Sequence, residues 1–233
     1  MMFSLLVSCR KNSKFLAKLI FSYLSKTKNL DQTEMLIMIS NEDTWNTDLL
    51  NFVCTIYPDR IKVFREDYGM GRKGLHVYFN ELAAKSRGDW LWYFCDDHDI
   101  VMQDYDWYIK SIIDLHQMNP HKIYQIIPRC SNSGSIAHIL SRGWFDISGD
   151  LGKHANIDSY INYVTFYLPE YRIFRPDDPV IIDYTADPTI MTPEHNKAFI
   201  NQSLVFPLGE SQEVQLLAKK DGQRLAIAIE QGL

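Results

Sequence analysis

Residues 95–99 read Cys-Asp-Asp-His-Asp and directly follow the apolar run Trp-Leu-Trp-Tyr-Phe. Three carboxylates this close together repel one another unless a cation lies between them, and the imidazole beside them is a further possible ligand. Mg²⁺ and Mn²⁺ prefer such oxygen ligands, and Mn²⁺ also accepts imidazole. The segment therefore predicts a divalent-metal site. The alternative is a solvated acidic turn that caps the following helix, since carboxylates stabilise a helix N-terminus.

The elements around this segment decide where the acidic cluster lies. Apolar runs typical of strands alternate in the first half with segments that have helical spacing. The expected strands cover residues 3–8, 34–40, 60–64 and 90–94, and the expected helices cover 15–24, 47–55 and 75–85. Unbroken apolar strands between helices indicate an α/β fold with a mostly parallel sheet that helices cover on both faces.

Polar groups follow three of these strands, at residues 10–12, 41–43 and 96–99. Ligands of such sheets bind at the carboxyl ends of the strands. We therefore expect the three polar groups to meet at one edge, which favours the metal site over the capping turn.

The second half has a less regular pattern. The spacing predicts helices over 105–116, 158–166 and 193–203, and strands over 123–127, 136–141, 172–174 and 180–183. The final stretch, 216–233, predicts a peripheral helix that is interrupted at Gly222.

Composition limits the class of protein. The 233 residues contain 24 Lys and Arg against 29 Asp and Glu, a net charge of −5, and 46% are hydrophobic. This composition is that of a globular chain and argues against a nucleic-acid partner bound by phosphate neutralisation. We expect no integral membrane segment, and Arg10 and Lys11 follow the first apolar run too early for a signal peptide. The four cysteines lie far apart in the sequence, which indicates a reducing, cytoplasmic location.

The order of elements resembles the GT-A fold glycosyltransferases, especially their inverting, family-2-like group. The resemblance rests on FSLLVSC, KFLAKLIFSYL and EMLIMIS, on the Asn80-containing stretch HVYFNELAAKSRGDW, and on WLWYFCDDHDI, and covers roughly residues 3–174. It implies a single GT-A, Rossmann-like domain over 1–233. A nucleotide-sugar-binding half would cover 1–104, an acceptor half 105–205 and a peripheral C-terminal segment 206–233.

The resemblance also implies a role for the acidic segment. The family's Asp-x-Asp metal motif falls on Asp96, Asp97 and His98, in an Asp-x-His form, with Asp99 just outside. A frame shifted by one residue would use Asp97 and Asp99 instead. In the family, Mn²⁺ or Mg²⁺ at this motif bridges the two phosphates of a nucleotide-diphosphate sugar, which is Lewis-acid catalysis.

The family's nucleotide pocket forms at the ends of the first two strands and at a loop that carries basic residues. Those positions correspond here to Ser8, Cys9, Arg10, Asn41, Asp43, Arg72 and Lys73, together with Asp96 and Asp97. The usual Pro-x-aromatic-Asn motif after the first strand is reduced to Asn12. The basic pair also fits an exposed turn.

An inverting transfer to an acceptor hydroxyl needs a general base. The family's base precedes a helix in the acceptor half, and Asp158 corresponds to it best, with Asp150 as the second choice. Asp158 could instead be the N-cap of the helix that follows. Two other functions stay open. One is a nucleotide- or carbohydrate-binding protein with a degenerate transferase fold. The other is a nucleotidyltransferase, although no Gly-rich loop of the GxGxR kind follows the first strand.

Overall fold

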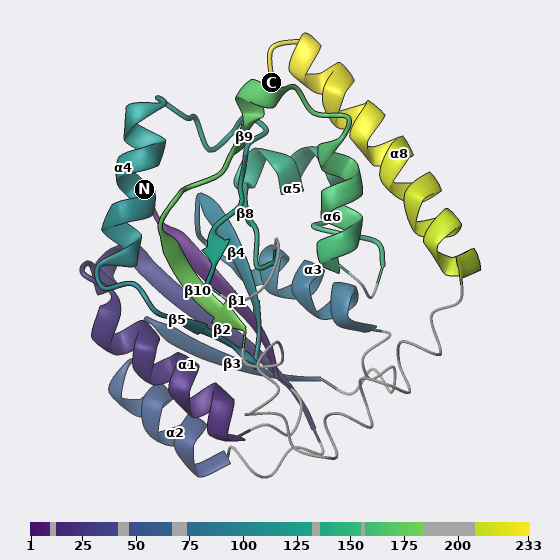
Figure 1. Cartoon of the computed structure of the whole chain (residues 1–233). Coiled ribbons are helices and arrows are strands. Elements are labelled where there is room, and N and C mark those ends of the chain that lie inside the picture. Colours follow the sequence, from purple (N-terminus) through teal and green to yellow (C-terminus); the bar gives the residue numbers. More distant parts are fainter. Residues whose placement is uncertain (10–12, 42–46, 67–73, 132–135, 155–156, 184–207) are drawn as a thin grey trace.

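The computed structural model describes residues 1–9, 13–41, 47–66, 74–131, 136–154, 157–183 and 208–233 (Figure 1). Seven strands form the main sheet in the order β3-β2-β1-β4-β8-β6-β9. Their bounds are β1 Phe3–Cys9, β2 Thr33–Ser40, β3 Ile61–Glu66, β4 Trp90–Cys95, β6 Gln125–Ile126, β8 Ile139–Ser141 and β9 Ile173–Phe174. All pairs are parallel except those that β8 makes with β4 and β6. The predicted α/β fold with a mostly parallel sheet is therefore confirmed.

Helices cover both faces of this sheet (Figure 1). The helices are α1 Ser13–Lys26, α2 Thr47–Ile56, α3 Leu75–Lys85, α4 Tyr105–Leu115, α5 Arg142–Ser148, α6 Ile157–Thr165 and α8 Leu208–Glu230. Side chains of α1, α2 and α4 fill one core cluster, and those of α3, α5, α6 and α8 fill the other. None of the described helices is long and apolar enough to cross a membrane.

Strand β4 shows why an unbroken apolar run suits this position. Trp90, Trp92 and Phe94 point into the first core cluster, whereas Leu91 and Tyr93 point into the second. Because successive side chains of a strand point to opposite faces, a strand between two layers of helices needs apolar residues throughout.

A second, three-stranded sheet was not predicted in this form. It has the order β5-β10-β7, with bounds His98–Ile100, Pro179–Asp183 and Arg129–Cys130. His98 and Asp99 of the acidic segment thus lie in a strand that pairs with β10, and not in the helix-capping turn that was the alternative interpretation of the segment. The pairing joins residues about 80 positions apart, which local spacing cannot reveal.

The C-terminal helix corrects another expectation. Helix α8 runs through Gly222 without interruption. A Cβ at Gly222 would lie 2.6 Å from Cδ2 of Tyr167, so the glycine lets the helix approach the end of α6 closely. Val214, Ala218 and Leu225 of α8 are buried in the second core cluster. Residues 142–148 are also helical, which the pattern left unassigned, and the predicted helix over 193–203 lies outside the described residues.

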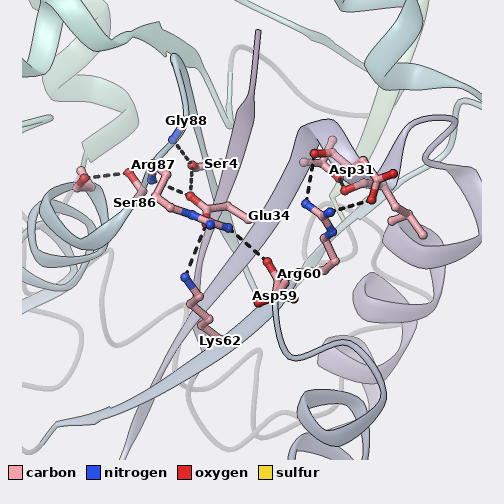
Figure 2. Close-up of polar contacts among 12 residues, drawn as sticks. Ser4, Asp31, Glu34, Asp59, Arg60, Lys62, Ser86, Arg87 and Gly88 are labelled. Atoms are coloured by element: carbon pink, nitrogen blue, oxygen red, sulfur yellow. Dashed lines mark hydrogen bonds and ion pairs between the residues drawn. The ribbon is translucent and has the colours of Figure 1, made fainter.

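Glu34 organises the amino ends of the central strands (Figure 2). This carboxylate is only 1% exposed, and it accepts hydrogen bonds from Ser4 Oγ at 2.7 Å and from Arg87 N and Nε at 2.6 and 3.0 Å. Lys62 Nζ lies 3.9 Å away. Ser4 Oγ also accepts the N–H of Gly88, where a Cβ would lie 2.4 Å from that oxygen. Glu34 thereby fixes the turn that precedes β4. It also fixes the start of β4, the strand that leads to the acidic segment.

Replacing Glu34 with Ala should lower the free energy of unfolding by about 2–4 kcal/mol, because it removes three hydrogen bonds to a buried carboxylate. Urea unfolding followed by circular dichroism measures the change. The matched control is Asp31→Ala, which breaks the 2.6 Å ion pair between Asp31 and Arg60 (Figure 2). The Asp31 side chain is 93% exposed. A surface pair contributes little, so this loss should stay below about 1 kcal/mol. Equal losses in both variants would contradict the prediction.

Candidate active site

The carboxyl ends of β1, β2 and β4 lie side by side, as predicted for the polar groups that follow them. Ser8 is paired with Cys95 in the parallel register of β1 and β4. One residue further on, the Cys9 thiol donates a hydrogen bond to Asp96 Oδ2 at 3.3 Å. A residue predicted for the nucleotide pocket thus contacts one predicted for the metal.

The other residues predicted for the nucleotide pocket are less well described. Asn41 lies exposed at the end of β2. Arg10, Asp43, Arg72 and Lys73 lie outside the described residues, so their predicted roles stay predictions.

A group of possible metal ligands forms where β4 ends and β5 begins. Ligand atoms of Cys95, Asp97 and His98 all lie within 4.8 Å of one another. His98 is buried, with 5% exposed, and its Nε2 lies 3.7 Å from Asp97 Oδ1. Two of the three predicted ligands, Asp97 and His98, therefore lie together. Cys95 joins them, whereas Asp96 contacts Cys9 instead.

The hydrogen bonding of His98 indicates which of these residues would bind a metal more strongly. Its Nδ1 accepts the backbone N–H of Cys95 at 3.2 Å. A neutral imidazole with an accepting Nδ1 carries its proton on Nε2, the atom that faces Asp97. Ligation through Nε2 would move that proton to Nδ1 and break the bond to the Cys95 backbone. We therefore expect Asp97 to be the stronger ligand and His98 to support it.

The donor set fits a divalent cation. A carboxylate oxygen suits Mg²⁺ and Mn²⁺, and imidazole suits Mn²⁺. The Cys95 sulfur is a softer donor that favours Zn²⁺ over both. The sequence alone did not indicate Cys95 as a third donor, because a cysteine directly before an acidic run is also typical of the end of a buried strand.

Asp183 is a polar residue near this group that the sequence analysis did not include among the site residues. It lies directly opposite His98 in the antiparallel pairing of β5 with β10. Residues opposite each other in such a pair have Cβ atoms about 4.5–5.5 Å apart on one face of the sheet. Asp99, the alternative ligand of the shifted frame, is buried, and its Oδ1 accepts the N–H of Ile100 at 2.8 Å.

Asp158, the predicted base, lies in the first turn of α6. Its Oδ1 accepts a hydrogen bond from the Tyr93 hydroxyl at 2.8 Å and from the Ala137 N–H at 3.2 Å. Neither donor belongs to α6, because Tyr93 lies in β4 and Ala137 lies just before β8, so this oxygen does not cap its own helix. Burial and the charge of Asp158 raise the pKa of Tyr93 well above its usual value, which keeps the phenol protonated as a donor.

Asp150, the second choice for the base, has a different environment. Lys153 Nζ lies 3.5 Å from its Oδ2 and 2.7 Å from Asp221 Oδ1 of α8, and Tyr160 donates to the other Asp221 oxygen. Burial raises the pKa of Asp150, which the charge of Lys153 opposes. The contacts among Asp150, Lys153 and Asp221 hold α8 against the segment before α6, so a structural role of Asp150 accounts for them.

Asn80, which the family resemblance included, and Arg142 tie helix α3 and the turn after it to α5 and to the loop that precedes α6. Asn80 of α3 donates to the Gly152 carbonyl at 2.9 Å and accepts the Leu151 N–H at 2.7 Å. Arg142 donates to the carbonyl oxygens of Ala83 in α3 and of Gly88 in the turn between α3 and β4. The Asn-containing helix thereby fixes the loop that precedes α6 and Asp158.

Comparisons with known proteins bear on the fold. No protein-family model matches the sequence, and a search of curated proteins finds no match. Solved structures of GT-A glycosyltransferases do match. TarS of S. aureus has a TM-score of 0.63 at 13% identity, over 78% of this chain and 36% of TarS. The mannosyltransferase PcManGT of Pyrobaculum calidifontis, in complex with GDP-Man and Mn²⁺, has a TM-score of 0.63 at 11% identity, over 78% of this chain and 56% of that one.

These matches show the fold of the chain. It spans little more than half of PcManGT and about a third of TarS. A fragment of TarS, 1–349, was solved in complex with UDP-GlcNAc. A cytidylyltransferase from Leptospira borgpetersenii also matches, with a TM-score of 0.53 at 12% identity over 97% of both chains. The chain therefore has the GT-A fold that the sequence predicted.

Proposed function

We propose that this protein is a glycosyltransferase that moves a sugar from a nucleotide-diphosphate sugar to an acceptor hydroxyl with inversion at the anomeric carbon. The observation that carries the proposal is the placement of Asp158. Its Oδ1 is held by Tyr93 of β4, the strand whose end carries the group of possible metal ligands. No described residue donates a hydrogen bond to its Oδ2, and Asp158 is half-buried and not fully enclosed, which supports access of an acceptor hydroxyl to this oxygen.

The reaction would be a single displacement. The acceptor oxygen forms a bond to the anomeric carbon from the face opposite the leaving group, and the bond to the nucleotide diphosphate breaks. Asp158 takes the proton of the acceptor hydroxyl, a contribution of about 10²–10⁴ in rate for a well-placed base. Residues 1–104 would bind the donor, and residues 105–205 would bind the acceptor.

Asp97 would hold a divalent metal, Mn²⁺ or Mg²⁺, with help from His98, Cys95 and Asp96. Such a metal would neutralise charge on the diphosphate and make it a better leaving group. Its positive charge would also allow a chain of net charge −5 to bind a diphosphate. Ser8, Cys9, Arg10, Asn41, Asp43, Arg72 and Lys73 would line the nucleotide pocket. Their number and mixed polarity suit a base, a ribose and two phosphates.

A donor screen tests the proposal. The protein, with Mn²⁺, is incubated with UDP-, GDP- and TDP-linked sugars, and free nucleoside diphosphate is measured. We expect one donor to give slow hydrolysis without an acceptor, because water can take the acceptor's place. Calorimetry with the free nucleotides is run beside it. Metal-dependent nucleotide binding without turnover of any donor would favour the degenerate, binding-only fold.

A nucleotidyltransferase is the second candidate, since the cytidylyltransferase match covers nearly the whole of both chains. The two functions differ in the bond that breaks. A nucleotidyltransferase consumes a nucleoside triphosphate and a sugar phosphate and releases pyrophosphate. A glycosyltransferase releases a nucleoside diphosphate. Pyrophosphate release from CTP with a panel of sugar phosphates would therefore decide for the second candidate.

A further inference from the structure

Tyr93 connects β4, whose end carries the possible metal ligands, to the predicted base Asp158. Its side chain is 1% exposed and points into the second core cluster from β4. The ring packs against Phe79 of α3, with centroids 5.3 Å apart. Its hydroxyl reaches out of this apolar surrounding to Asp158 Oδ1. A tyrosine hydroxyl buried this deeply needs a partner, and here the partner is the predicted base.

The contact constrains Asp158 strongly. A carboxylate on a first helical turn can rotate about two side-chain bonds. Two donors from different parts of the chain, the Tyr93 hydroxyl of β4 and the Ala137 N–H just before β8, meet on Oδ1. Oδ1 is thereby used for anchoring, and Oδ2 is held in one direction.

We propose that Tyr93 is a positioning residue of the transfer reaction: its hydroxyl fixes the Asp158 carboxylate so that Oδ2 faces the acceptor hydroxyl. The inference rests on the proposed function, with Asp158 as general base. Tyr93 lies two residues before Cys95 on the same strand, so one rigid element orients both the base and the group of possible metal ligands. Rigid support of this kind matters because a small misplacement of a catalytic group lowers the rate strongly.

Tyr93→Phe tests the inference, because the ring that packs against Phe79 is retained and only the hydroxyl is lost. We expect kcat of transfer to fall about 10- to 100-fold, with KM for the donor within about twofold of the original. The matched control is Tyr105→Phe. Tyr105 is also 1% exposed, and its hydroxyl lies 2.9 Å from Thr27 Oγ1 in the first core cluster. Both variants should lose similar thermal stability, while only Tyr93→Phe loses kcat.

A double-mutant cycle separates positioning from general loss of structure. If Tyr93 acts through Asp158, adding Tyr93→Phe to Asp158→Asn should lower kcat no further, since the base is already absent. An additive loss, or an unchanged kcat in Tyr93→Phe alone, would overturn the inference. Full activity of Asp158→Asn would instead refute the proposed role of Asp158, so the two failures are distinguishable.

Discussion

Replacing Asp158 with Asn should lower kcat of sugar transfer by about 10²–10⁴, with little change in KM for the donor. The amide keeps the size of the carboxylate and can still accept the Tyr93 and Ala137 hydrogen bonds at Oδ1. It cannot take the proton of an acceptor hydroxyl at neutral pH. Initial rates of nucleotide release at saturating donor and acceptor measure the change, with circular dichroism to show that the fold is retained.

Asp150→Asn is the matched control for this prediction. Asp150 is the second choice for the base, and its ion pair with Lys153 also involves Asp221 of α8. We expect this variant to lose some stability and to keep kcat within a few fold. If Asp150→Asn loses activity and Asp158→Asn keeps it, the assignment of the base is wrong and Asp150 takes the role.

Asp97→Asn should weaken Mn²⁺ binding about 10- to 100-fold and lower kcat/KM for the donor by a similar or larger factor. Asn loses the charge, whereas the Cys95 sulfur and the His98 ring stay in place. The electron paramagnetic resonance signal of free Mn²⁺ measures binding without any assay of activity. His98→Ala should weaken binding less than Asp97→Asn, because the Nδ1 of His98 is already bonded to the Cys95 backbone.

Two further variants separate the possible frames of the metal motif. Asp96→Asn tests the frame of the Asp-x-His form, and Asp99→Asn tests the shifted frame. We expect neither to match Asp97→Asn, since Asp96 accepts the Cys9 thiol and Asp99 accepts the Ile100 N–H. Equal binding of Mn²⁺ by the original protein and Asp97→Asn would refute the metal role. Competition with Mg²⁺ and Zn²⁺, repeated with Cys95→Ser, reports whether the thiol takes part.

The first half of the fold could be predicted closely from the sequence. The helix over residues 75–85 has the predicted bounds, and β1, β2 and β4 differ from prediction by one residue at an end. These elements follow from periodicity and from unbroken apolar runs, which depend on neighbours along the chain. The second half could be predicted less well. Its strands are short, and Gly222 lies inside the C-terminal helix, where it allows the close approach of Tyr167, 55 positions earlier.

The sequence by itself determined which groups could do chemistry and at which edge of the sheet they lie. The acidic segment follows an apolar strand, and the carboxyl ends of parallel strands must meet, so the contact between Cys9 and Asp96 could be expected. Only the tertiary structure decided which of these groups meet residues from distant parts of the chain. The Tyr93 hydroxyl meets a carboxylate 65 positions away, and β10 brings Asp183 opposite His98. Such contacts depend on how layers pack and how distant strands pair, and no spacing along the chain encodes them.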